Sequence, residues 1–264
     1  MEYAAPNLTG KISIWAAALM MTAMASAPAQ ADEANAKQLF KAMSDYLASQ
    51  KAISFDYDTN LEIVTKQRQK IALASSGTLI LNRPDKLRAT RTGGFANIQL
   101  VFDGKTVSLL GKDRNVYAQA ETPGTIDNLV DELRDKFNRP LPAADLLKSN
   151  PYDELMPLVV DVKDLGSGVI HGVECDHLAF RTKEDVDFQI WIAQGDRPYP
   201  CRYVVTSTKI AGGPQYTIDV SSWKTGAEVA SDNFNFAVPD GAEKLRVVNL
   251  PDLDEVPDVF AMKN

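Results

Sequence analysis

The stretch Ser76–Gln119 alternates short apolar runs with tight turns, and it limits the fold more than any other part of the chain. Asn82–Asp85 ends the first run, because proline fixes φ and lacks a backbone donor, and asparagine and aspartate favour turns. Asp103-Gly104 lies between two apolar runs and favours a hairpin with positive φ at both central residues. Strands joined by such short turns are antiparallel neighbours, so the stretch predicts a meander of four or five strands.

The rest of the chain predicts helices and strands in separate groups. Apolar residues at helical spacing predict one helix over Glu33–Gln50 and another over Thr125–Asn138, whose apolar face includes Leu129 and Leu133. Shorter helical pieces are expected over Ala143–Lys148 and Tyr152–Met156. Alternation predicts the remaining strands over Ile53–Thr65, Gln69–Leu81, Val159–Leu165, Gly168–Ile170, Val173–Arg181, Asp185–Ala193, Cys201–Ile210 and Gln215–Trp223, with Phe234–Val238 and Leu245–Val248 as edge segments.

Strand groups separated by helix groups are typical of α+β proteins with an antiparallel sheet. A sheet of about eleven strands tends to curl on itself. We therefore expect an α+β fold, a curved antiparallel half-barrel of about eleven strands with the middle helices over its concave face. Residues 32–250 are expected to form this single domain, and residues 251–264 a mobile acidic tail.

Residues 1–31 have the build of a secretory signal peptide. Ile12–Ala25 is an apolar core, and Ala29–Ala31 matches the small-x-small pattern that predicts cleavage after Ala31. The alternative is a membrane anchor, but the core is shorter than the ~20 apolar residues of a spanning helix. We therefore expect an exported, soluble periplasmic protein that begins at Asp32 and has no membrane span after the signal is removed.

The charge balance excludes some classes of partner. The chain has 28 basic and 35 acidic residues, a net charge of −7. Nucleic-acid binding needs a basic footprint, and docking on an anionic membrane needs basic clusters, so neither is expected. The sequence indicates no oligomeric state.

Three short patterns resemble ion or phosphate sites. Asp56, Asp58 and Asn60 open like a calcium loop, but Leu61 stands where the loop needs glycine and Gln67 where it needs glutamate, so one polar strand face is the simpler interpretation. Gly104-Lys105-Thr106 resembles a phosphate loop without its first glycine or its helix. His171, Cys175 and His177 are metal-type residues, but structural zinc normally needs four ligands. We expect no metal site.

Catalytic patterns are equally weak. The chain has no Gly-x-Ser-x-Gly elbow and only two histidines to act as a base. Acid pairs such as Glu184-Asp185 could serve glycoside hydrolysis without a local motif, yet they lie on turns and polar faces, where solvated charge is the default. We expect a protein that is not an enzyme and that has no catalytic residues and no cofactor.

The chain has two cysteines, Cys175 and Cys201. An exported protein with two cysteines suggests one disulfide. In a regular meander, however, both would lie opposite Ile192 on either side of one strand, roughly 9–10 Å apart. That exceeds the ~7 Å limit for a bridge. A disulfide and a pair of buried free thiols therefore both stay open.

Several segments resemble an uncharacterised bacterial family of predicted periplasmic proteins. They are Gly77–Arg88, Asp103–Lys105, Tyr117–Gln119, Leu141–Leu147, Gly172–Arg181 and Gln189–Ile192. More distantly, the strand, Arg-Pro turn, strand and Asp-Gly-Lys pattern is similar to the periplasmic lipoprotein carrier LolA and its relatives. That resemblance implies a half-barrel closed by a helical lid over an apolar cavity, and it assigns no ligand-binding residue.

Together these features predict a non-enzymatic periplasmic carrier or binding protein for a lipid, lipoprotein or other apolar ligand. Thr125–Asn138 and Ala143–Met156 are the expected lid. The alternative is a signalling or scaffold module of the envelope that uses the same fold without bound lipid.

Overall fold

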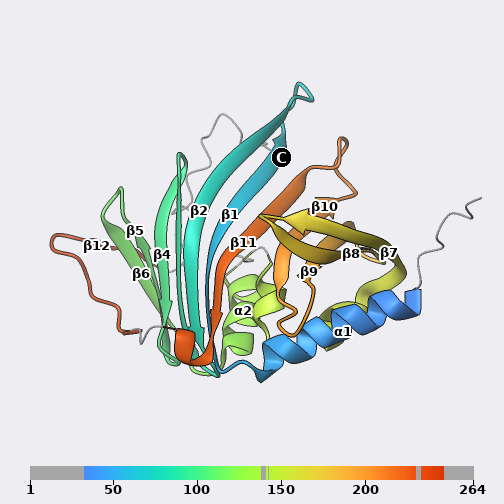
Figure 1. The fold of residues 1–264 in the computed structure, drawn as a ribbon. Helices are drawn as coiled ribbons and strands as arrows, with labels where there is room; N and C mark the ends of the chain where they lie inside the picture. Colours follow the sequence, from blue (N-terminus) through green and yellow to red (C-terminus); the bar gives the residue numbers. More distant parts are fainter. Residues whose placement is uncertain (1–32, 138–140, 142, 230–232, 247–264) are drawn as a thin grey trace, which may run out of the picture. The chain divides into compact units, whose positions relative to one another are not determined.

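Twelve strands of the described chain form one sheet (Figure 1). The computed structural model describes residues 33–137, 141, 143–229 and 233–246. The predicted signal peptide with its cleavage site and the predicted tail 251–264 lie outside these residues. The sheet order is β12-β6-β5-β4-β3-β2-β1-β11-β10-β9-β8-β7.

The strands account for most of the described chain. They are β1 (Ala52–Val64), β2 (Lys70–Asn82), β3 (Lys86–Gly93), β4 (Ala96–Phe102), β5 (Thr106–Gly111), β6 (Val116–Glu121), β7 (Val159–Ile170), β8 (Val173–Thr182), β9 (Val186–Ala193), β10 (Pro200–Ser207), β11 (Gln215–Thr225) and β12 (Glu243–Lys244). The helices are α1 (Glu33–Ser49), α2 (Ile126–Asp135) and α3 (Pro151–Leu155), with 3₁₀ turns η1 (Ala144–Leu147), η2 (Met156–Leu158) and η3 (Gly226–Glu228).

The sheet is largely antiparallel, and β1 is shared by two meanders. β1 to β6 follow one another on one side, and β7 to β11 form the other side, where β11 pairs with β1. The helices between β6 and β7 lie inside the curve of the sheet (Figure 1). The predicted α+β fold class with helices over a concave face is therefore confirmed.

Three local predictions need correction. β7 is one strand where two were expected, because Gly166 (φ 83°) sits in a bulge between Asp164 and Ser167 and does not end the strand. Phe234–Val238 is not a strand, and the last strand is the short β12, parallel to β6. The β4–β5 hairpin has positive φ at Gly104 but not at Asp103, whose carboxylate instead accepts from the amides of Lys105 and Thr106.

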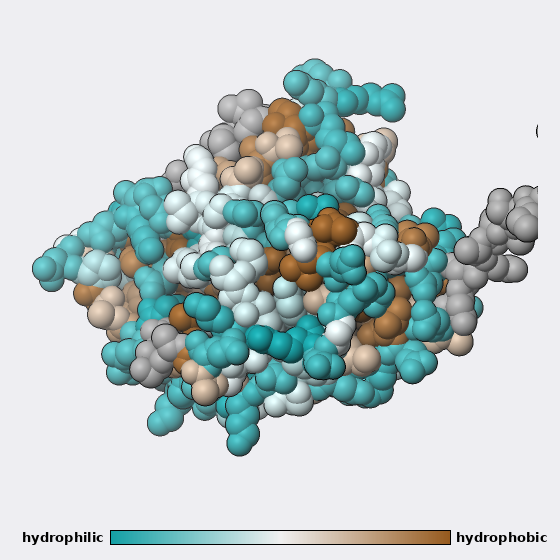
Figure 2. Space-filling view, viewed as in Figure 1, coloured by the Kyte–Doolittle hydropathy of each residue, from teal (hydrophilic) through white to brown (hydrophobic). Residues whose placement is uncertain are grey.

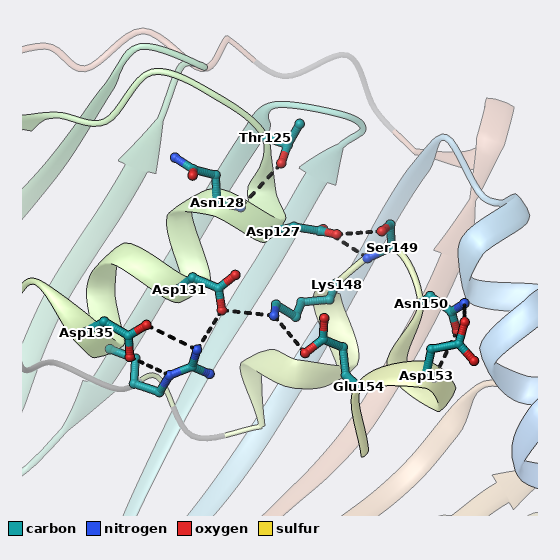
Figure 3. Close-up of polar contacts among 11 residues, drawn as sticks. Thr125, Asp127, Asn128, Asp131, Asp135, Lys148, Ser149, Asn150, Asp153 and Glu154 are labelled. Carbon is teal, nitrogen blue, oxygen red and sulfur yellow. Dashed lines mark hydrogen bonds and ion pairs between the residues drawn. The ribbon is translucent and has the colours of Figure 1, made fainter. Parts of the chain in front are cut away.

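Apolar helix faces complete the core. α1 buries Ala36, Phe40, Met43 and Leu47 at the spacing predicted from the sequence. Thr125 caps α2 as predicted, accepting a hydrogen bond from the amide of Asn128 (Figure 3). None of the helices in the described part of the chain has the length and hydrophobicity needed to cross a bilayer.

Candidate ligand-binding site

Cross-strand register arranges the inward side chains of β1–β5 in rows, because residues two apart on each strand share a face. The first row is fully apolar and buried: Ile53, Leu81, Leu87, Phe102 and Val107. The second row is also apolar: Phe55, Leu79, Ala89, Leu100 and Leu109. The third row is mixed: Tyr57, Gly77, Arg91, Ile98 and Gly111. The concave face therefore changes from apolar to polar along the strands.

A cavity of about 120 Å³ lies against the second and third rows. Its opposite wall comes from the chain after α2, with Leu141, Ala143, Ala144 and Leu147, and from Tyr216 and Ile218 of β11. A smaller space of about 40 Å³ shares Phe55, Leu147 and Ile218 with it and extends toward α1. The lining is mostly hydrocarbon, as expected for a site that takes an apolar molecule.

The polar end of the cavity is ordered by Tyr57. Its hydroxyl donates to the carbonyl of Thr90 at 2.7 Å. Its ring lies across Gly77, where an added Cβ would come within 2.6 Å of the ring. Burial raises the pKa of Tyr57, the neighbouring Tyr216 raises it further, and the positive charge of Arg91 opposes both. The phenol is therefore neutral at physiological pH.

Lys148 joins the helices α2 and α3, which lie before and after it in the chain. Its side chain is almost fully buried, and its Nζ lies 2.9 Å from Asp131 of α2 and 3.0 Å from Glu154 of α3 (Figure 3). Burial lowers the pKa of Lys148, but the hydrogen bonds that its ammonium donates to Asp131 and Glu154 outweigh this effect, so the pKa is raised. The charged ammonium thus links α2, η1 and α3 into one unit, here called the helical cover.

The helical cover is anchored at both ends. At the β2–β3 turn, Arg83 donates to the carbonyl of Lys148 at 3.2 Å, and the carbonyl of Pro84 accepts from the amide of Ile126 at 2.8 Å. At α1, the hydroxyl of Ser44 accepts from the amide of Tyr152 at 3.0 Å. Between Ile126 and Tyr152, the apolar side chains of Leu141, Ala143, Ala144 and Leu147 meet the cavity.

Asp145 in η1 makes the stability of the helical cover depend on pH. Burial raises its pKa above the ordinary value of 3.8, although Arg134 and Lys148 oppose the rise. Because the folded state disfavours the ionised form, stability falls as pH rises from about 3.8 through the higher folded pKa. We expect Asp145→Asn to unfold at higher temperature than wild type at pH 7, with the difference vanishing near pH 3. Thermal melts from pH 3 to 8 measure this.

The exposed Asp196→Asn is the matched control and should leave the melting curve unchanged at every pH. A constant difference between Asp145→Asn and wild type across the whole range would contradict the expectation.

On the face seen in Figure 2, hydrophobic side chains emerge as separate brown patches among teal and white residues.

Comparison with known proteins places the chain in a family. Residues 36–248 match the family model described as "Predicted periplasmic protein (DUF2092)". The chain belongs to this family. The predicted family and its periplasmic location are therefore confirmed. A comparison with curated proteins found no match.

Solved structures similar to this DUF2092 protein include an uncharacterised conserved protein from Thermus thermophilus, with 12% identity, a TM-score of 0.46, and 80% of this chain and 99% of that chain covered. Mycobacterium tuberculosis lipoprotein LppX is 12% identical with a TM-score of 0.44, covering 73% and 96%. A LolA superfamily protein from Nitrosomonas europaea is 9% identical with a TM-score of 0.34, covering 72% and 93%.

The two cysteines of this DUF2092 protein are both buried and lie in one small cluster with Ile170 and Ala193. Cys175 lies opposite Ala193, and Cys201 sits at a bulge in β10, so the regular register expected from the sequence does not hold there. Burial raises the pKa of Cys175, and a hydrogen bond with Cys201 opposes the rise. The disulfide between them stays a prediction.

The other residues singled out in the sequence lie apart from the cavity. The ring of His177 stacks on that of Trp191, with 3.9 Å between the ring centres. The Nε2 of His171 lies 3.9 Å from a carboxylate oxygen of Asp219. Within residues 33–246, as far as they are described, no three His, Cys, Asp or Glu side chains gather as a metal site.

Two apolar residues of the predicted lid also lie away from the cavity. Leu129 and Leu133 of α2 are fully packed in the core and do not line the cavity. Arg91 and Tyr57, which do line it, were not singled out from the sequence. Their signal was inward alternation along β3 and β1.

Proposed function

We propose that this DUF2092 protein is a non-enzymatic periplasmic carrier or binding protein for a lipid, lipoprotein acyl chain or other apolar ligand. The observation that carries the proposal is the apolar cavity between the second row of the sheet and the side chains of Leu141, Ala143, Ala144 and Leu147. The described residues that line it include no carboxylate, imidazole or thiol, which supports binding over catalysis.

Burial of hydrocarbon supplies the affinity. Each methylene moved out of water contributes about 0.8 kcal/mol. The cavity of about 120 Å³ is smaller than the several hundred Å³ typical of ligand pockets. A long chain would therefore have to displace some of the apolar side chains Leu141, Ala143, Ala144 and Leu147. The segment that follows them is held by Arg83 at the carbonyl of Lys148 and by Ser44 at the amide of Tyr152.

Native mass spectrometry of protein purified from the periplasm tests the proposal. We expect a co-purified acyl species, or uptake of a fatty acid added to delipidated protein. Ala89→Phe should abolish binding, because the new ring projects from the second row into the cavity. Ala72→Phe is the matched control, since the same ring at this exposed position on β2 leaves the cavity open.

A wild-type protein without bound or acquired lipid would overturn the proposal and favour the alternative, an envelope scaffold or signalling module. Equal loss of binding in Ala72→Phe and Ala89→Phe would also count against the cavity as the binding site.

A further inference from the structure

Arg91 is the one charged side chain among the described residues that line the cavity. It lies in the third row, between Gly77 and Ile98, at the end where the concave face becomes polar. Its Nε is buried and has no hydrogen-bond partner among the described residues. Its guanidinium lies 5.0 Å from the centre of the Phe95 ring. The cation therefore meets a ring face on one side and the cavity on another.

Burying the Nε of Arg91 without a hydrogen-bond partner destabilises the protein when the cavity is empty. A buried donor without a partner loses the hydrogen bond that it makes with water and gains none in exchange. The aromatic ring of Phe95 offers partial compensation only. Arg83, the other arginine with an unpartnered buried Nε, donates through its Nη2 to the cover. Among the residues that the structure describes, none accepts such a bond from Arg91, so its donors are available to the cavity.

The rows of the sheet give the cavity a direction. Phe55, Leu79 and Leu100 belong to the second row and form the apolar floor of the cavity. Arg91 of β3 lies in the third row, next to it along the strand direction. A molecule lying along the strands would have its hydrocarbon on the floor and its end group beside the guanidinium. That end group needs acceptor oxygens and negative charge, since arginine pairs with carboxylate and phosphate groups through two parallel hydrogen bonds.

We propose that the ligand is a single-chain amphiphile with an anionic head group, its tail on the Phe55 row and its head group bound by Arg91. This inference rests on the proposed function, because it assigns the chemistry of the ligand that the cavity takes. A neutral head group could accept a hydrogen bond from Arg91, but only an anionic one also gains the attraction between opposite charges.

Isothermal titration at pH 8 with decanoate and decanol tests the inference, because the two probes share a chain and differ in charge. Wild type is expected to bind decanoate about tenfold more tightly, in keeping with a charge-assisted hydrogen bond. Arg91→Gln should bring decanoate down to the affinity of decanol, and Arg91→Lys should retain part of the preference. Arg88→Gln is the matched control, because Arg88 lies on the same strand with its side chain on the opposite face.

The outcomes separate the two proposals. Equal affinity for decanoate and decanol in wild type, or a preference that survives in Arg91→Gln, would overturn the anionic head group and leave the apolar carrier intact. Binding of neither probe would overturn both. Inorganic phosphate is the third probe, and binding at Arg91 as tight as that of decanoate would replace the amphiphile with a small-anion site. Thermal melts of each variant confirm that the compared proteins are folded.

Discussion

Phe40→Ala is expected to lower the free energy of unfolding by about 3–5 kcal/mol, the largest effect of any single substitution considered for this protein. Phe40 is fully buried on α1, and its ring lies 5.0 Å from that of Phe180 and 6.2 Å from that of Phe188. The centre of its ring also lies 5.8 Å from that of Tyr152 in the helical cover. Truncation would leave a hole where α1, the sheet and the cover meet. Urea denaturation followed by tryptophan fluorescence measures the loss.

Gln38→Ala on the same helix is the control, because Gln38 is exposed and its truncation should change stability by less than about 0.5 kcal/mol. A loss below about 1 kcal/mol for Phe40→Ala would show that α1 can repack or detach without affecting the sheet, contrary to the expectation.

Gly77→Ala is expected to destabilise the protein by about 2–3 kcal/mol and to disturb the polar end of the cavity. An added Cβ would lie 2.0 Å from the carbonyl oxygen of Thr90 and 2.6 Å from the ring of Tyr57. The carbonyl belongs to the backbone of β3, so relief requires the strands to separate or Tyr57 to leave its hydrogen bond. Thermal denaturation measures the stability, and decanoate binding reports on the cavity.

Gly94→Ala is the matched control, since nothing lies within 4 Å of the added Cβ at this turn. We expect it to be neutral or slightly stabilising, because alanine reduces the conformational freedom of the unfolded chain. Similar melting temperatures for the two variants would mean that β2 and β3 yield at Gly77 more easily than their close approach implies.

Much of the fold was predictable because its determinants are local. The alternation in Ile98–Phe102 and the turn signal in Asn82–Asp85 each occupy only a few consecutive positions. The strand and the turn both lie where the sequence predicts them. Gly166 misled the prediction, because glycine in a strand pattern can mark either a turn or a bulge. The choice depends on pairing with β8, which local sequence does not contain.

The candidate site was less accessible to sequence reasoning. That Arg91 lines a cavity follows only from the pairing of five strands, which forms the rows, and from the position of Tyr216 on β11. Read alone, Lys86–Thr92 is a strand with a mostly polar face. The bulge at Cys201 likewise depends on how β10 meets β9, so the relation of the two cysteines could not be settled from spacing.

The place of β1 in the sheet has a consequence for how the chain reaches its native state. β1 pairs on one side with β2, its neighbour in sequence, and on the other with β11, the last long strand to be synthesised. Until β11 arrives, one edge of a thirteen-residue strand is open to pairing with other chains, a recognised route to aggregation. We therefore expect a nascent chain of this protein to need protection from aggregation along β1 until β11 has paired with it.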